Sequence, residues 1–175
     1  LCQEITLPTT PLKGIDDPDG EIALCILSAI NVGAIGNLNE LETLCDLSVR
    51  ALDEIIELQD YPVKAAEVST KSRRSLGIGY IGLAHYLAKN GVKYSDPKAW
   101  ELVDRLSEAF QYYLLRASCD IAEEKGKCSA FDKTKYADGL LPIDHYKKEV
   151  DEIVVHKQRM AWETLRKDIL KYGLR

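Results

Sequence analysis

The strongest constraint in this sequence is one long amphipathic segment between Asp96 and Gly126. Asp96 has a typical N-cap side chain, and Pro97 suits the first turn of a helix, where its missing N–H breaks no hydrogen bond. Apolar residues then recur at helical spacing from Trp100 to Ile121, and Gly126 is a typical stop. These signals predict a helix of roughly 28 residues, about 42 Å long at about 1.5 Å per residue. We therefore expect a helix-rich fold.

Further helices are predicted on both sides of this segment. Residues 40–58 carry apolar side chains at steps of three and four, after a capping-box pair at Asn39 and Glu42 and before Pro62. Shorter helices are expected at residues 80–89, 142–150 and 160–172, the first and last of which are followed by the glycines Gly91 and Gly173.

The first 36 residues predict extended structure instead. Prolines and glycines make residues 8–21 rich in turns. Residues 22–27 form a continuous apolar run, which is typical of a strand buried on both faces, although a short buried helix fits the same run. The sequence thus predicts one unit over residues 1–175, with a loop and a buried strand in residues 1–36 and mainly helix in residues 37–175.

Charge and hydropathy exclude several classes of protein. The 23 basic and 28 acidic residues give a formal net charge of −5. Nucleic-acid and anionic-membrane surfaces need clustered Lys and Arg, so we expect neither partner. The longest apolar run, residues 22–30, is too short to span a bilayer, and no signal peptide is visible. We expect a cytoplasmic protein.

Five cysteines occur at irregular spacing, and this odd count does not predict a disulfide framework. No CxxC or Cys/His ligand pair is present, so no metal site is predicted. The chain begins with Leu1 rather than Met and stops at Arg175 without a tapering tail. Both features lead us to expect a piece of a longer protein.

Several motifs occur in order along the whole chain: LCQEI at residues 1–5, GEIALC at 20–25, RSLGIG at 74–79, QYYLL at 111–115 and LPID at 141–144. In this combination they resemble the large (alpha, catalytic) subunit of class I ribonucleotide reductases. The resemblance implies a segment of that family's ten-stranded α/β barrel, with a few short strands and about five helices. It also implies the activity of ribonucleoside-diphosphate reductase, by a thiyl-radical mechanism.

The resemblance assigns roles to three residues. Cys2 matches the cysteine that becomes a transient thiyl radical and removes the 3′ hydrogen of the ribose. Glu4 matches the base that takes the proton of the 3′ hydroxyl, and an extended segment would project both side chains to the same side, against the substrate. Cys25 matches one of two redox-active cysteines that reduce the 2′ carbon and end as a disulfide.

The resemblance also implies partners. They are the remainder of the large subunit, a small subunit that generates the radical at a metal centre, thioredoxin or glutaredoxin as reductant, and nucleoside triphosphate effectors. This segment itself is expected to bind no cofactor directly, and alone to be inactive and to expose apolar surface where neighbouring strands belong. Two alternatives stay open: a non-catalytic helical interaction module, and one piece of a split large subunit.

The remaining motifs are interpreted as structural. The GxGxxG pattern at residues 77–82 follows a polar, basic segment rather than a core strand, which argues against dinucleotide binding. Arg73 and Arg74 are expected in a solvated turn, Tyr112 and Tyr113 in ordinary helix packing, and Cys45 in the core. No role is assigned to the other two cysteines, Cys119 and Cys128, and the three isolated histidines are expected to be structural or exposed.

Overall fold

Two parallel strands form the small sheet around which the chain is arranged. In the computed structural model, which describes residues 6–153 and 158–175, β1 (Ile26–Asn31) pairs with β2 (Leu76–Ile81) from Ile26↔Leu76 to Asn31↔Ile81. Parallel strands need a crossover between them, and here it contains α1 (Glu40–Leu58) and α2 (Lys64–Arg73). The chain thus contains one βαβ unit, followed by helices.

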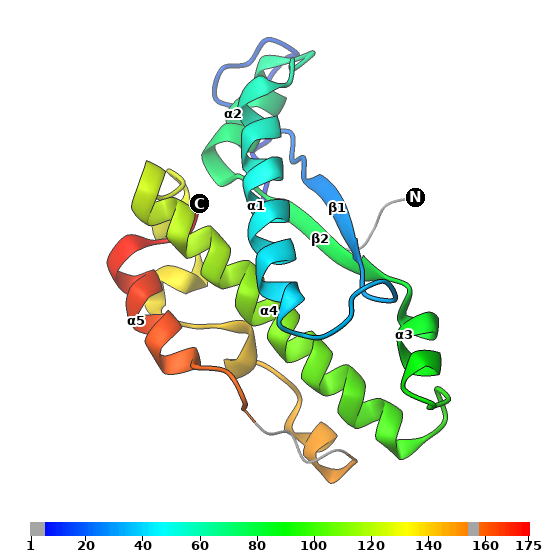
Figure 1. Ribbon diagram of the computed structural model, residues 1–175. Coiled ribbons are helices and arrows are strands. Elements are labelled where there is room, and N and C mark those ends of the chain that lie inside the picture. The colour runs from blue at the N-terminus through cyan, green and yellow to red at the C-terminus, as the bar shows by residue number, and fades with distance from the viewer. Residues whose placement is uncertain (1–5, 154–157) are drawn as a thin grey trace.

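The two longest helices cover one face of this sheet. α4 (Pro97–Lys125) crosses behind α1 in Figure 1, and both lie on the same side of the strands. Val49 of α1 and Ile121 of α4 pack together against Leu76 and Ile78 of β2. Tyr80 meets Phe110 of α4 edge to face, with ring centroids 5.4 Å apart. Alternate residues of β2 therefore point into the helical layer.

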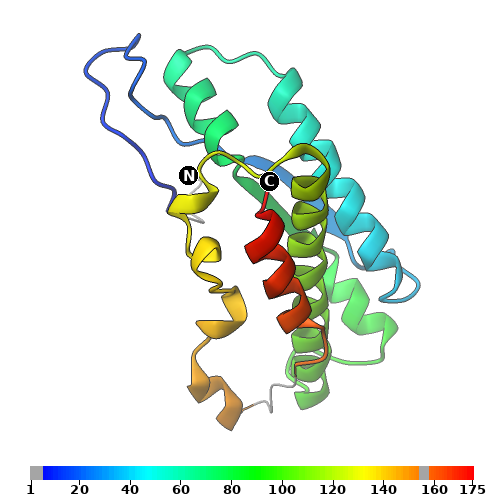
Figure 2. The same ribbon diagram turned by 90° about the vertical axis from the view of Figure 1, so that its left-hand side faces the viewer.

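The rest of the chain returns along α4. α3 (Leu83–Lys89) joins β2 to the start of α4, and α5 (Trp162–Tyr172) packs beside the second half of α4, as Figure 2 shows. Four short 3-10 helices lie between α4 and α5 in the sequence, at Phe131–Lys133, Lys135–Asp138, Pro142–Asp144 and Lys148–Glu152.

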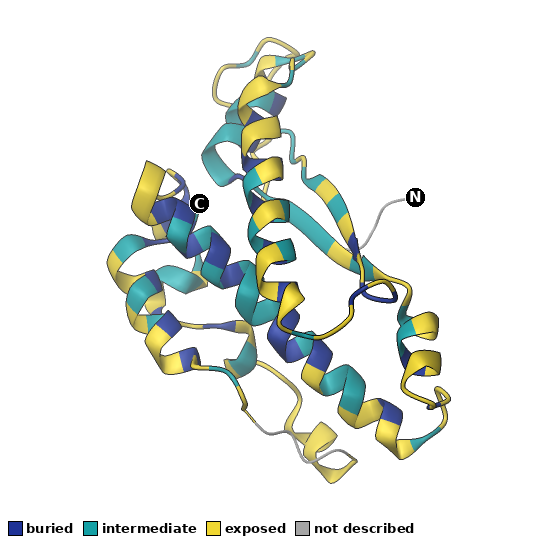
Figure 3. Cartoon of the chain, viewed as in Figure 1, coloured by how far each residue is buried: buried dark blue, intermediate teal, exposed yellow. Residues whose placement is uncertain are grey.

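The core runs along α4 rather than around a single centre. Leu106 and Phe110 pack with Leu41 and Cys45 near the start of α1, whereas Cys119 packs with residues of α5 further along. Figure 3 shows buried positions recurring along the inner sides of α1 and α4. α4 therefore contributes residues to several hydrophobic clusters along its length.

The bounds predicted for the two long helices are confirmed, but the predicted capping is wrong, since neither Asn39 nor Asp96 makes a side-chain capping hydrogen bond. α4 begins at Pro97 and ends before Gly126, and α1 covers residues 40–58 as expected. Cys45 is fully buried in the core. The helix-rich α/β class, with few short strands and five α-helices among the described residues, is also confirmed. The division into residues 1–36 and 37–175 stays a prediction.

Two predictions near the strands are wrong in detail. The apolar run at residues 22–27 enters the ladder only at Ile26, because β2 offers partners for Ile26–Asn31 alone. The strand is also not buried on both faces, since Leu27 and Ala29 are exposed. The helix expected at 80–89 begins at Leu83, because Tyr80 and Ile81 belong to β2 and Gly82 separates the two elements.

Three further differences have local causes. α2 was not predicted, although Glu67 forms ion pairs with Lys64 and Lys71 at helical spacing. The helix expected at 142–150 is replaced by two 3-10 helices, because the Asp144 carboxylate accepts the N–H of Leu141 and closes a tight turn. The last helix begins at Trp162 instead of residue 160. None of the described helices is long and apolar enough to cross a membrane.

Candidate active site

Two of the three predicted site residues fall where the structure is not described. Cys2 and Glu4 belong to residues 1–5, outside the described ranges. Their closeness to each other and to Cys25 stays a prediction. The described part of the candidate site begins at Cys25.

Cys25 is a free, half-buried cysteine directly before β1. The next residue, Ile26, donates its N–H to the carbonyl oxygen of Ser75 at 3.1 Å, which ties this end of β1 to β2. The Cys25 Sγ lies beside Gly77, since a Cβ placed on that glycine would be 3.9 Å from the sulfur. The strand pairing thus fixes which residue of β2 the thiol faces.

The thiol lies on the face of the sheet that α1 and α4 leave open. Side chains alternate along a strand, so Cys25 shares a face with Leu27 and Ala29, both of which are exposed. On β2 the same face carries Gly77 and Gly79. The side chain of Leu27 lies over Gly77, where a Cβ would be 2.5 Å from its Cδ2, whereas a Cβ at Gly79 would have no atom within 4 Å. This face of the sheet is therefore open beyond Leu27.

The other described cysteines have a different environment. Cys45 and Cys119 are fully buried and Cys128 nearly so. Burial raises the pKa of Cys45 to about 12 and that of Cys119 to about 11, and it also raises the pKa of Cys128. Thiolates are the reactive form of cysteine, so these three thiols are suited to packing rather than exchange. Of the cysteines in residues 6–153 and 158–175, Cys25 alone is partly open to solvent.

A buried ion cluster that was not predicted from the sequence holds β2 in place. Arg74 has a left-handed backbone with φ of 49°, and its Nε donates to the Asp53 carboxylate of α1 at 2.7 Å. Its Nη1 donates to Glu57 at 2.5 Å. Arg175 reaches the same Asp53 carboxylate at 2.9 Å. The expectation of a solvated turn is therefore wrong for Arg74, and also for Arg73, which donates to Glu21.

The charge on Asp53 depends on these partners. Burial by itself would raise the pKa of its carboxyl, but hydrogen bonds from Arg175 and Arg74, together with their charges, outweigh burial and lower the pKa. The sequence contains one signal of this cluster. Asp53 lies one turn after Val49 on the apolar face of α1, where a charged residue needs a buried partner.

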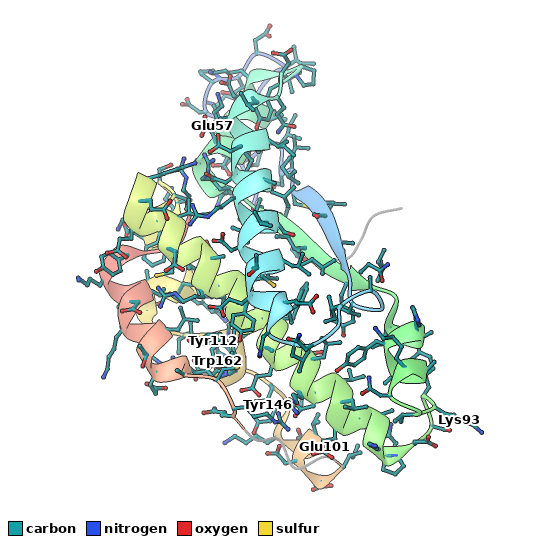
Figure 4. The ribbon with its side chains drawn as sticks, viewed as in Figure 1. Glu57, Lys93, Glu101, Tyr112, Tyr146 and Trp162 are labelled. Atoms are coloured by element: carbon teal, nitrogen blue, oxygen red, sulfur yellow. The ribbon has the colours of Figure 1, made fainter. Side chains whose placement is uncertain are left out.

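A second buried carboxylate fixes the approach to α5. Glu108 of α4 accepts hydrogen bonds from the backbone N–H of Arg159 at 2.7 Å and from the indole Nε1 of Trp162 at 3.0 Å. Figure 4 shows Trp162 beside Tyr112, and their rings meet edge to face at 5.3 Å. Tyr112 and Tyr113 also contact each other, which confirms the prediction that the tyrosine pair serves packing.

Gly77 and Gly79 lie inside β2, and only Gly82, with φ of 78°, occupies the turn between strand and helix. In a dinucleotide-binding turn the glycines follow the strand, so this pattern has another cause. His85 and His145 are exposed, and His156 lies outside the described residues. Residues 6–153 and 158–175 hold no group of three or more His, Cys, Asp or Glu that could bind a metal.

A cavity of about 670 Å³ lies away from Cys25. Its lining includes Leu87, Trp100 and Trp162, from α3, α4 and α5. It does not include Cys25, Gly77 or Gly79. Gly77 instead lines a second cavity, of about 410 Å³, together with Leu114 and Phe131, and Cys25 does not line it.

Comparison with known proteins gives matches over the whole chain. The family model of the ribonucleotide reductase barrel domain matches residues 1–175. This chain belongs to that family. It is 59% identical to the ribonucleoside-diphosphate reductase subunit alpha of Buchnera aphidicola subsp. Schizaphis graminum and 58% identical to that of Haemophilus influenzae. The identity to ribonucleoside-diphosphate reductase 1 subunit alpha of Escherichia coli is 54%.

In each of these three comparisons the match covers 100% of this chain and 23% of the relative. The chain thus spans about a quarter of the length of the alpha subunits it resembles. The described strands and helices are a segment of the ribonucleotide reductase barrel, as the sequence motifs implied.

Proposed function

We propose that this chain works as the part of a ribonucleoside-diphosphate reductase alpha subunit that supplies active-site cysteines. The substrates are ribonucleotides, with diphosphates favoured, and the products are deoxyribonucleotides. Family membership over the whole chain and identities of 54–59% to alpha subunits support this proposal. The observation that carries it within the described residues is the placement of Cys25, partly open to solvent and beside Gly77 of β2.

In this proposal Cys2 carries the thiyl radical that removes the 3′ hydrogen of the ribose, and Glu4 takes the proton of the 3′ hydroxyl. Both assignments rest on the sequence motif, because residues 1–5 are outside the described part. A general base must lie within hydrogen-bonding reach of its proton, and Glu4 is only two residues from the sulfur.

Cys25 then supplies reducing equivalents together with a second cysteine from the remainder of the subunit. Two thiols become one disulfide, and the two electrons and two protons released replace the 2′ hydroxyl by hydrogen, while that hydroxyl leaves as water. Thioredoxin or glutaredoxin restores the thiols by thiol–disulfide exchange. The buried thiols of Cys45 and Cys119, with raised pKa values, are poor candidates for this exchange.

The remainder of the large subunit is the first partner in the proposal. The open face of the sheet exposes Leu27 at 63% and Ile81 at 56%, which supports the expectation of apolar surface left for neighbouring strands. A two-stranded sheet is marginal by itself, so neighbouring strands should cover these side chains. A small radical-generating subunit with its metal centre and nucleoside triphosphate effectors complete the proposed enzyme. The isolated chain should not reduce nucleotides.

A single-turnover experiment tests the role of Cys25. The complete, pre-reduced subunit is mixed with the small subunit and a ribonucleoside diphosphate without external dithiol, and its cysteines are mapped by mass spectrometry. We expect product to form in proportion to a new disulfide that contains Cys25. Cys2→Ser should abolish product but leave substrate binding intact. Cys45→Ser is the matched control and should change neither product nor disulfide. Product formation with Cys25 still reduced would contradict the proposal.

A further inference from the structure

A polar pocket of about 420 Å³ lies on the molecule apart from Cys25. It is formed by the loop after β1, the end of α3 and the first half of α4. Its polar lining consists of Asn37, Asn39, Tyr86, Lys89, Asn90 and Arg105. No Asp or Glu lines this pocket, although the chain has 28 acidic residues against 23 basic ones. The lining is therefore rich in hydrogen-bond donors and carries positive charge.

Arg105 is unusual among the arginines. The other seven, at positions 50, 73, 74, 116, 159, 166 and 175, all form ion pairs with carboxylates. Within the described ranges Arg105 forms none, even though Glu101 lies one turn earlier on α4 and lines the cavity next to this one. A guanidinium is always charged at neutral pH and offers five N–H donors. Arg105 thus brings an uncompensated cation to the pocket.

Lys89 is held in place without a carboxylate. Its Nζ donates to the carbonyl oxygens of Gly33 at 3.2 Å and Ile35 at 2.9 Å. These two bonds fix the ammonium group between α3 and the loop after β1. An ammonium group has three donors, so one N–H remains for a further acceptor. The pocket therefore contains a positioned cation in addition to the exposed side chain of Arg105.

The location is favourable for an anion. The loop that lines the pocket joins the carboxyl end of β1 to the N-terminus of α1, a helix of 19 residues. Ligands of parallel α/β folds commonly bind outside the carboxyl ends of the strands, and the positive end of a helix dipole attracts anions. Glu40 opposes this attraction in part. Its carboxylate accepts the backbone N–H groups of Gly36 and Asn37 and the side-chain amide of Asn37, so these donors are already used within the loop, and Glu40 itself does not line the pocket.

We propose that this pocket binds a phosphate group, either free or carried by a larger molecule. Arg105 contacts the phosphate oxygens in a bidentate manner, and Lys89 contributes a point charge. The hydroxyl of Tyr86 and the amide of Asn39 are further donors on the wall. The site is separate from the Cys25 face and does not depend on the redox chemistry proposed above.

Lysine footprinting tests this site without any activity measurement. The complete subunit is treated with an acetylating reagent, and the acetylation rate of each lysine is measured by mass spectrometry. Inorganic phosphate, and in a second arm a simple phosphate monoester, is compared with chloride at equal ionic strength. At about four times the dissociation constant, Lys89 should be acetylated about fivefold more slowly. Lys93, which Figure 4 shows on the nearby surface and which does not line the pocket, should be unaffected.

The matched variants are Arg105→Gln and Arg105→Lys. Arg105 makes no ion pair within the described residues, so both variants should fold normally. Loss of a charged hydrogen-bond donor costs about 1.5 kcal/mol of binding free energy. In Arg105→Gln, protection of Lys89 should therefore need about ten times more phosphate. Arg105→Lys should retain part of it. Equal protection of Lys89 and Lys93, no protection of Lys89, or unchanged protection in Arg105→Gln would overturn the proposal. Protection by the monoester at lower concentration than by phosphate would identify a larger molecule as the source.

Discussion

Replacement of Asp53 by Asn should destabilise the chain strongly, because it removes the shared partner of two arginines. The side chains of Asp53 and Arg74 are each only 4% exposed, and Nη2 of Arg74 lies 2.5 Å from the carboxylate. Removal of one member of a buried ion pair costs about 3–5 kcal/mol. Glu57 still bonds Arg74 in the variant, and the Asn oxygen can accept one hydrogen bond, so we expect the low end, about 3 kcal/mol.

Urea denaturation followed by circular dichroism measures this loss as a change in the free energy of unfolding. Arg50→Gln is the matched control, because Arg50 is also an ion-paired residue of α1 but pairs with the exposed carboxylates of Asp46 and Glu124. Exposed pairs contribute about 0–1 kcal/mol, so this control should lose less than about 1 kcal/mol. A similar loss in the two variants would refute the argument from burial.

Comparison of the parent chain with Asp53→Asn at several pH values tests the charge on Asp53. The folded-state pKa of Asp53 is lowered from its ordinary value of 3.8, so its contribution to stability is present above that value. The contribution is lost as the pH falls through the folded-state pKa. The difference in unfolding free energy between the parent chain and Asp53→Asn should therefore be constant near neutral pH and should shrink on acidification below about pH 4. A difference that grows on acidification would contradict the assigned ionisation.

Two further predictions concern the contact between Glu108 and Trp162 and the turn at Gly82. Glu108→Ala should lower the free energy of unfolding by about 3 kcal/mol and increase hydrogen exchange at residues 159–162, because the buried indole N–H of Trp162 loses its acceptor. Glu108→Gln keeps an acceptor oxygen and should lower it by only about 1 kcal/mol. Equal losses for the two variants would argue against this bond as the anchor. Gly82→Ala should lower the free energy of unfolding more than Gly91→Ala, as measured by thermal unfolding. Both glycines have positive φ, which costs an alanine about 1–2 kcal/mol. Only at Gly82 would a Cβ also collide with Asn31 Oδ1. Similar losses would show that the contact with Asn31 is easily relieved.

The sequence by itself determined the long helices and the family. Pro97 and Gly126 specify the ends of α4 through local backbone chemistry, and the apolar spacing of residues 40–58 specifies the inner side of α1. Such signals involve residues within a few positions of one another, so they can be recognised without knowledge of the fold. The family resemblance depended on motifs along the whole chain and needed no geometry.

Tertiary structure alone decided which polar groups are buried and which face of the sheet is open. Arg73 and Arg74 form a basic pair in the sequence, and only the approach of Glu21 and Asp53 makes them partners of carboxylates 52 and 21 positions away. The apolar run before β1 could not show that Leu27 faces outward, because burial depends on what packs against each side of the strand. The exposure of Cys25, in contrast to the buried Cys45, likewise follows from the packing of α1 and α4 on one face. Contacts between distant segments have no local signature, and this is why they emerged only with the fold.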